Sequence, residues 1–345
     1  MLLTDSDALF HLSLSRITFL KFNEKNFLSK NIDNSNALSL LSIEDIEQLL
    51  HRKIGSKAVW NGKQNLREAE IALHHCKNLG IEILLNNERN YPELLRQISD
   101  PPYLLFCRGD ETLLTERSVS VVGTRRLSPE GKKAAREFSY AAAVDGCNVV
   151  SGLANGADGY AHQGAVDAYF DYVEKGLDTA GLGKTIAVLP SSIDQVLPYS
   201  HKKLAAQILQ SGGLIVSEYE PGMGMANWHY VARNRIIAGL SPATVVVEAP
   251  AGSGALITAD FALEMNRDLI FHKVTFGELA KKIADNSNAA LEKEHAQGNV
   301  STYKLENRPE KFLEAGAPVI SDYKDYLKCL AEAPGTRNPV QGELF

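Results

Sequence analysis

The residues best suited to chemistry lie in turns that follow predicted strands and are rich in glycine, serine and arginine. The stretch SVSVVGTRR (118–126) ends on two arginines, and SGLANGADGYAHQGA (151–165) has small residues through its turn. A third stretch, AGSGALITA (251–259), has a Ser-Gly pair where a helix is expected to begin. Such turns gather backbone N–H groups and helix N-termini at one edge of a parallel sheet, where α/β proteins bind anions. The sequence therefore predicts a phosphate-binding edge.

A cluster of arginines begins a predicted helix in HYVARNRIIAGL (229–240). Arg233 and Arg235 flank Asn234, and the aromatic rings of Trp228 and Tyr230 come just before them. Two guanidinium groups with an amide between them suit either a phosphate clamp or an intramolecular lock across the sheet edge. Interleaved basic and aromatic groups are typical of proteins that bind single-stranded nucleic acid.

Lys202 and Lys203 are predicted to lie in the first turn of another helix. Cations at this position oppose the helix dipole. This small cost is reasonable if a polyanion passes over them, although a solvated helix face is an equal alternative. Tyr199, just before them, offers a ring for base stacking.

Few residues are placed to react. Glu248, at the carboxyl end of its strand, is the one acid well placed to act on a ligand, unless it pairs with a neighbouring arginine. Asp158 suits either a helix cap or a ligand contact, and His162 suits a packing role. No nucleophile–base–acid set, Walker A motif or G-x-G-x-x-G fingerprint is present. We therefore expect a binding protein rather than an enzyme, with no metal and no cofactor.

The elements that must position these residues follow the rhythm of an α/β fold. Continuous apolar runs, expected when helices cover both faces of a sheet, alternate with helical patterns. About six parallel strands are predicted, at 119–123, 147–152, 185–190, 213–218, 244–249 and 268–272. The fold class is α/β, a Rossmann-like, doubly wound, mostly parallel sheet preceded by a small helical N-terminal domain.

Patterning also suggests where the domains divide. Residues 1–85 are expected to form the small helical domain, which either contacts DNA or only packs. Residues 86–330 are expected to form the Rossmann-like domain, with one insertion at 169–183 and a polar, mobile insertion near 275–310. Residues 331–345 have the composition of a tail.

Composition limits the class of protein. The chain has 345 residues, 44% of them hydrophobic, and a net charge of −6, so any nucleic-acid site must be a local basic patch. No apolar run is long enough to span a membrane, no signal-peptide pattern is found, and the four cysteines are widely spaced. We expect a cytoplasmic protein with reduced thiols.

Several motifs, in this order, resemble those of the DprA/Smf family of DNA-processing proteins. They are VVGTRR, SGLANGAD, the Asp194 to Leu204 segment, SEYEPG, RNRIIAGLS, VVVEA and SGALITA. The resemblance covers about residues 91–272. The motifs RNRIIAGLS and SGALITA are highly specific when they occur together. The sequence differs from the family's pattern at Asn155, at Val231 and at HKV (272–274), where the family usually has a Pro-Gly pair. The family's C-terminal winged-helix domain is also expected to be absent.

The resemblance implies a homodimer that binds single-stranded DNA without strong sequence preference and loads RecA recombinase onto it during natural transformation. Together with the turns described above, it predicts these DNA- or phosphate-binding residues: Gly123, Thr124, Arg125, Arg126, Ser151, Gly152, Lys202, Lys203, Tyr230, Arg233, Asn234, Arg235, Ser253 and Gly254. Two other functions stay open: a nucleotide-binding enzyme or sensor of the related phosphoribohydrolase-like fold, and a DprA-like protein in defence against foreign DNA.

Overall fold

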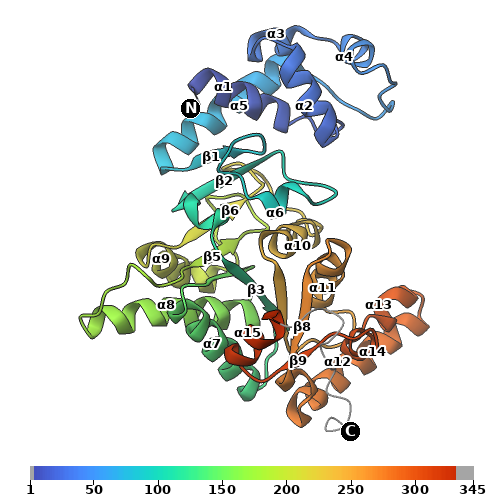
Figure 1. The fold of residues 1–345 in the computed structure, drawn as a ribbon. Helices are drawn as coiled ribbons and strands as arrows, with labels where there is room; N and C mark the ends of the chain where they lie inside the picture. Colours follow the sequence, from blue (N-terminus) through green and yellow to red (C-terminus); the bar gives the residue numbers. More distant parts are fainter. Residues whose placement is uncertain (1–3, 332–345) are drawn as a thin grey trace.

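A nine-stranded sheet forms the centre of the molecule (Figure 1), in a computed structural model that describes residues 4–331. The strand order is β1-β2-β6-β5-β4-β3-β7-β8-β9. The strands are β1 (Glu82–Leu85), β2 (Leu104–Gly109), β3 (Ser118–Gly123), β4 (Asn148–Ser151), β5 (Thr185–Val188), β6 (Leu214–Ser217), β7 (Ala243–Val247), β8 (Asp268–His272) and β9 (Val319–Ile320).

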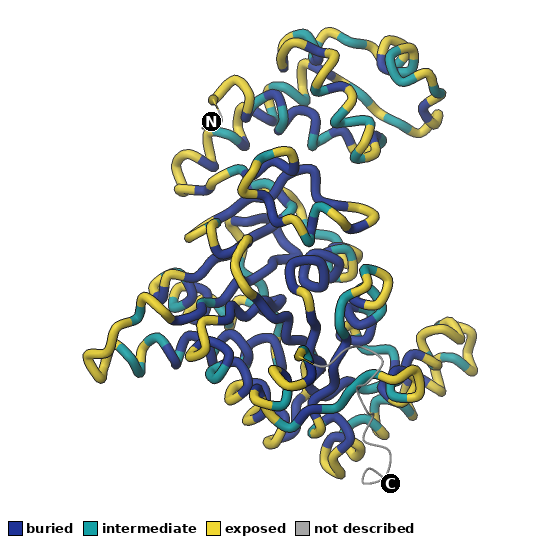
Figure 2. Tube along the Cα trace, in the orientation of Figure 1, coloured by how far each residue is buried: buried dark blue, intermediate teal, exposed yellow. Residues whose placement is uncertain are grey.

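The sheet confirms the predicted Rossmann-like α/β fold. All six expected strands, β3 to β8, are present and pair in parallel, and β9 extends the parallel part. Strands β1 and β2 add an antiparallel edge. We did not predict β2, whose short apolar run LLFC follows a proline-rich stretch. Figure 2 shows the central strands as buried, in agreement with their continuous apolar sequences.

Helices cover both faces of the sheet (Figure 1). One face packs against α7 (Pro129–Val144), α8 (Ala157–Glu174), α9 (Lys202–Gln210) and α15 (Tyr323–Ala331). The other packs against α6 (Glu93–Arg96), α10 (His229–Leu240) and α11 (Gly254–Glu264). Helix α8 continues to Glu174, so the first expected insertion is largely a helical extension.

Five helices precede the sheet and stand over its β1 edge (Figure 1): α1 (Asp5–Ser15), α2 (Phe22–Asn31), α3 (Ser35–Leu40), α4 (Ile43–Leu50) and α5 (Gly62–Leu79). Helix α4 begins at the predicted Ser42 cap, whose hydroxyl accepts a hydrogen bond from the Asp45 N–H. The apolar core of these helices runs into that of the sheet, because Leu12, Leu28 and Tyr103 belong to one cluster. Strand β1, which lies where the sequence IEILLNN (81–87) predicts a strand, belongs to the sheet.

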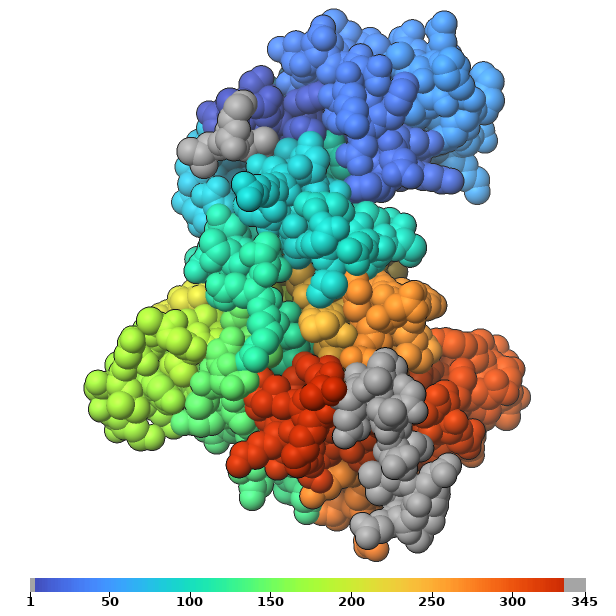
Figure 3. Space-filling view, viewed as in Figure 1, coloured from blue at the N-terminus to red at the C-terminus, as the bar shows by residue number. Residues whose placement is uncertain are grey.

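The segment near 275–310, whose polar sequence favours helix, forms helices. It contains α12 (Glu278–Ala296) and α13 (Thr302–Glu306), and α14 (Pro309–Glu314) follows. Leu291 and Phe312 are buried, so these helices pack against the domain; Figure 3 shows them as a protruding part of the surface. Beyond Ala331 the expected tail lies outside the described residues. Among residues 4–331, no helix is both long and apolar enough to cross a membrane.

Candidate nucleic-acid interface

The candidate site lies where the strand order reverses, at the carboxyl ends of β3 and β7. From β3 the chain continues to β4 on one side of the sheet, and from β7 it continues to β8 on the other. Open α/β sheets bind ligands at such a switch point. Gly123 is required by close packing, since a Cβ atom there would lie 1.9 Å from the Val247 carbonyl oxygen. The Thr124 N–H donates to the Glu248 carbonyl at 2.7 Å, and the Thr124 carbonyl accepts from the Ala157 N–H at 3.1 Å. These contacts hold the β3–α7 and β4–α8 turns side by side.

A cavity of about 400 Å³ opens at this edge. We call it the switch-point cavity. It brings together residues from three of the predicted turns and from α10. Its lining includes these predicted site residues: Gly123, Thr124, Arg125, Arg126, Tyr230, Arg233, Asn234, Ser253 and Gly254.

Arg125 is the exposed cation of this cavity. Its guanidinium lies over the Tyr230 ring, 5.2 Å from the ring centroid. A cation–π contact of this kind orients the guanidinium without consuming its N–H donors. Arg126 is also exposed, and its backbone N–H donates to the Thr124 hydroxyl. Both arginines are therefore free to contact an anion.

Ser253 begins helix α11 at the opposite wall of the cavity. It is the N-cap residue, with extended backbone angles, yet its hydroxyl caps no N–H of the helix. The Oγ atom is buried and has no hydrogen-bond partner among the described residues. A buried polar atom without a partner is unfavourable. A hydroxyl and a helix N-terminus together suit an anion that accepts from both.

Arg233 is an internal lock rather than an exposed clamp. Its side chain is only 4% exposed, and its Nη1 atom donates to the carbonyls of Gly152, at 2.6 Å, and Val188. Burial lowers the pKa of Arg233 to about 10, opposed by the nearby carboxylate of Asp158. The guanidinium thus ties α10 to the carboxyl ends of β4 and β5. This supports the second of the two alternatives left open by the sequence.

Asn234 bridges within the protein as well. Its Nδ2 donates to the Gly254 carbonyl at 3.2 Å, and its Oδ1 accepts from Arg233 at 3.3 Å. It therefore connects α10 to the start of α11 across the cavity. Asn234 lies in the wall of the cavity.

The β4–α8 turn supports the site from beneath. The Ser151 hydroxyl donates to the Val121 carbonyl at 2.6 Å, and neither Ser151 nor Gly152 lines the cavity. Asp158 accepts from the N–H groups of Gly152 and Ala154, and burial raises its pKa. His162 is buried and bonds to Leu153 and Thr185, and burial lowers its pKa to about 3. It is therefore neutral and structural, as its sequence context predicted.

Lys202 and Lys203 are exposed but do not line the cavity. The Lys202 ammonium lies 4.8 Å from the centroid of the Tyr199 ring, so this ring is partly covered. The start of α9 is joined to the β4–α8 turn, because the His201 Nδ1 atom bonds to the Leu153 carbonyl at 2.9 Å. The two lysines form an exposed cationic pair on a neighbouring turn.

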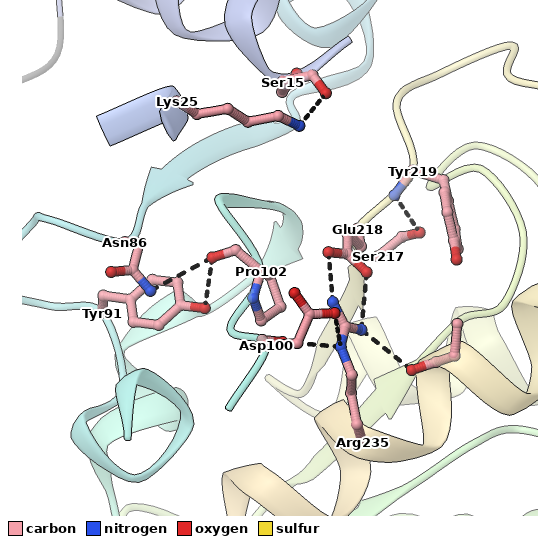
Figure 4. Close-up of polar contacts among 11 residues, drawn as sticks. Ser15, Lys25, Asn86, Tyr91, Asp100, Pro102, Ser217, Glu218, Tyr219 and Arg235 are labelled. Atoms are coloured by element: carbon pink, nitrogen blue, oxygen red, sulfur yellow. Dashed lines mark hydrogen bonds and ion pairs between the residues drawn. The ribbon is translucent and has the colours of Figure 1, made fainter. Parts of the chain in front are cut away.

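Arg235 lies on the other side of α10, in a second cleft (Figure 4). Its guanidinium forms a two-point ion pair with Glu218, at 2.9 and 2.7 Å, and its Nε donates to the Asp100 carbonyl. This cleft, of about 1050 Å³, is lined by residues of the N-terminal helices and of the sheet domain. Half-buried Lys25 also lies there and donates to the Ser15 carbonyl at 2.7 Å. The structure therefore does not place Arg235 with the other predicted site residues.

Glu248 caps a helix. Its carboxylate accepts from the Ser128 backbone N–H at 2.8 Å and from the Ser128 hydroxyl, while Ser128 itself caps α7 through the Gly131 N–H. Glu248 is 3% exposed and has a positive φ of 54°. The sequence suggested two roles for Glu248, ligand contact or pairing with an arginine. Its role at the start of α7 is neither of these.

Sequence reasoning missed two parts of the cavity wall. Thr258, one turn into α11, and Ser287, from α12, both line it. The first could have been found from helical spacing after Ser253. Nothing in the sequence indicated that α12 folds back to the site. Within residues 4–331, no group of three or more His, Cys, Asp or Glu side chains is arranged to hold a metal ion.

These features define an α/β protein whose sheet edge at the switch point carries helix N-termini, exposed arginines and an aromatic ring. A family model described as DNA recombination-mediator protein A matches residues 82–312. The chain belongs to this family. It is 30% identical to protein Smf of Borreliella burgdorferi over 275 residues, which is 79% of this chain and 82% of the relative.

Other relatives match over a smaller part of their length. Protein Smf of Synechocystis is 37% identical over 64% of this chain and 52% of its own, and DNA processing protein DprA of Bacillus subtilis is 35% identical over 55% and 60%. The crystal structure of DNA processing protein A from Streptococcus pneumoniae aligns with a TM-score of 0.61 and 26% identity, over 95% of this chain and 98% of that chain. DNA processing protein A from Helicobacter pylori, described with its mode of binding single-stranded DNA, has the same fold (TM-score 0.53, 24% identity, 73% and 95% coverage).

Proposed function

We propose that this protein binds single-stranded DNA without strong sequence preference at the switch-point cavity. In this role it protects the strand and, as a cytoplasmic homodimer, helps to load RecA recombinase onto it during DNA uptake. It performs no chemistry on the strand. The observation that carries the proposal is the convergence of Arg125, Tyr230 and the unpartnered Ser253 hydroxyl on one cavity at the switch point.

The arrangement suits a strand with accessible bases. Backbone N–H groups of the glycine turns and the Arg125 guanidinium would hold phosphates, and the Tyr230 ring would offer a face to a base. None of these groups reads the edge of a particular base, so recognition would depend on the backbone and on stacking. Membership of the family and the single-stranded DNA binding of the Helicobacter pylori relative both support this proposal.

The nucleotide-enzyme alternative is less well supported. It needed Glu248 to act on a ligand, but both carboxylate oxygens of Glu248 are engaged by Ser128 at the start of α7. A buried carboxylate in this role stabilises a helix and is not available as a base.

The test is a fluorescence-anisotropy titration of labelled oligo-dT and of its duplex form, each at two salt concentrations. Salt-sensitive binding to the single strand, much tighter than to the duplex, is expected. Equal affinity for both forms, or no binding at low salt, would contradict the proposal. RecA loading is then measured as the rate of RecA filament formation on strands coated with a single-stranded-DNA-binding protein, with and without this protein.

A further inference from the structure

A second cavity adjoins the switch-point cavity and is built largely by α12. Its volume is about 410 Å³, within the range of about 300–1,000 Å³ usual for pockets that hold small organic groups. Arg126 and Ser287 line both cavities, so the two share a wall. We call it the α12 cavity.

One face of α12 forms its wall. The lining residues recur at helical spacing over three turns: Ile283, Asn286, Ser287, Ala290, Leu291 and Glu294. The opposite wall is the β7–α11 loop at Ala251 and Gly252, together with Lys304 of α13. This is the segment that the sequence suggested to be a mobile excursion.

The two walls are joined by hydrogen bonds. The Asn288 Oδ1 atom accepts from the Ala251 N–H at 3.1 Å, and the Asn307 carbonyl accepts from the Gly252 N–H at 2.8 Å. A Cβ atom at Gly252 would lie 2.7 Å from Lys304 and 3.2 Å from Leu291, so the loop is packed closely against both helices. The α12 cavity is therefore a built feature of the same loop that carries Ser253.

The lining favours a base over a phosphate. Ile283, Ala290 and Leu291 supply apolar surface, and the exposed Asn286 supplies an amide that both donates and accepts at a base edge. Glu294 and Lys304 place one charge of each sign in the lining, so these two side chains give a phosphate no net positive charge, while Arg126 stands at the junction, where a phosphate would pass.

We infer that the α12 cavity is a nucleobase subsite: it takes the base of the nucleotide next to the phosphate held at Arg125 and Arg126. The inference rests on the proposed function and specifies which part of the strand the 278–306 helices contact. These helices thus form part of the DNA site of this chain.

The test compares two tryptophan substitutions on the same helix. Ala290 lines the α12 cavity and Ala289 does not, and both are exposed, so neither substitution should disturb folding. Affinity is measured for hexathymidylate and for an abasic strand of the same length and charge. Thermal unfolding of both variants verifies that they are folded.

Ala290→Trp should lower the affinity for hexathymidylate about tenfold, within the range for losing one base contact, and leave the affinity for the abasic strand unchanged. Ala289→Trp should bind both strands as the wild type does. Unchanged or tighter hexathymidylate binding by Ala290→Trp, or an equal loss for both strands, would overturn the subsite. If the wild type binds neither strand, the proposed function fails; if it binds and only the Ala290→Trp result differs, the subsite alone fails.

Discussion

Replacing Arg233 by methionine distinguishes a structural arginine from a DNA-contacting one. The guanidinium is buried and donates to the carbonyls of Gly152 and Val188, beside the Asp158 carboxylate. Methionine keeps most of the apolar volume and removes the donors, so the two carbonyls lose this donor and Asp158 loses a nearby positive charge. If Arg233 is an internal lock, the substitution should act on stability first.

The expected magnitude follows from those contacts. Two hydrogen bonds to a charged group contribute together about 3 kcal/mol at the low end of their range, and removing one member of a buried charged set typically costs about 3–5 kcal/mol. Part of this loss is offset, because methionine has no charge to remove from water, whereas the buried guanidinium does. The same desolvation lowers the pKa of Arg233 to about 10. We expect the free energy of unfolding to fall by about 3 kcal/mol and Tm by about 4 °C, since the entropy of unfolding of a chain of 345 residues is about 0.7 kcal/mol/K.

The assay is urea unfolding followed by circular dichroism, combined with oligo-dT binding below the unfolding transition. The matched control is Arg125→Ala, which is exposed and should change stability by less than about 0.5 kcal/mol. In Arg233→Met, the slope of log affinity against log salt should stay as in the wild type. Wild-type stability together with a large loss of DNA affinity in Arg233→Met would refute the reasoning.

Three further predictions concern groups around the site. Asn288→Ala leaves the Ala251 N–H without its acceptor. The loss of about 1 kcal/mol in positioning the loop should lower oligo-dT affinity, measured by anisotropy, about threefold to tenfold. Unchanged affinity would mean that the loop needs no such support. Glu248→Ala removes the contacts to Ser128, so urea unfolding should show a loss of about 2 kcal/mol; wild-type stability would contradict the capping role. Removal from water lowers the pKa of Lys25 from 10.5 to about 8. Below about pH 8 its charged ammonium therefore destabilises the folded state by roughly 3 kcal/mol. This cost disappears as the pH rises toward 10.5, because the folded form is then neutral while the unfolded form is still partly charged. Lys25→Met should therefore raise the free energy of unfolding at pH 7 much more than at pH 10, and an equal gain at both pH values would exclude this cause.

The fold followed from local patterns that tertiary packing did not override. Ser128 caps α7 and Pro129 lies in its first turn, so the start of this helix is encoded locally, because caps and N1 prolines act within one turn. Apolar runs of β-branched residues marked β3 and β7. Strand β2 was missed because its apolar run is short, and because one of its two partners, β6, is far away in the sequence.

The site was predictable in its turns but not in the direction of each side chain. Arg233 and Arg235 are two residues apart on α10, and residues at this spacing do not share a helix face. The phosphate clamp considered from the sequence did not take this spacing into account, and the structure places the two guanidiniums in separate cavities. The contribution of Ser287 depends on how α12 packs against the β7–α11 loop, which no local pattern specifies.

The most direct test of the central claim is the salt dependence of oligo-dT binding by the wild type and by Arg125→Ala. If the switch-point cavity holds the phosphates of a single strand, Arg125→Ala should bind all sequences more weakly and its salt slope should be smaller by about 0.7. An Arg125→Ala protein with wild-type affinity and wild-type salt slope would contradict the claim that the strand binds at this edge of the sheet.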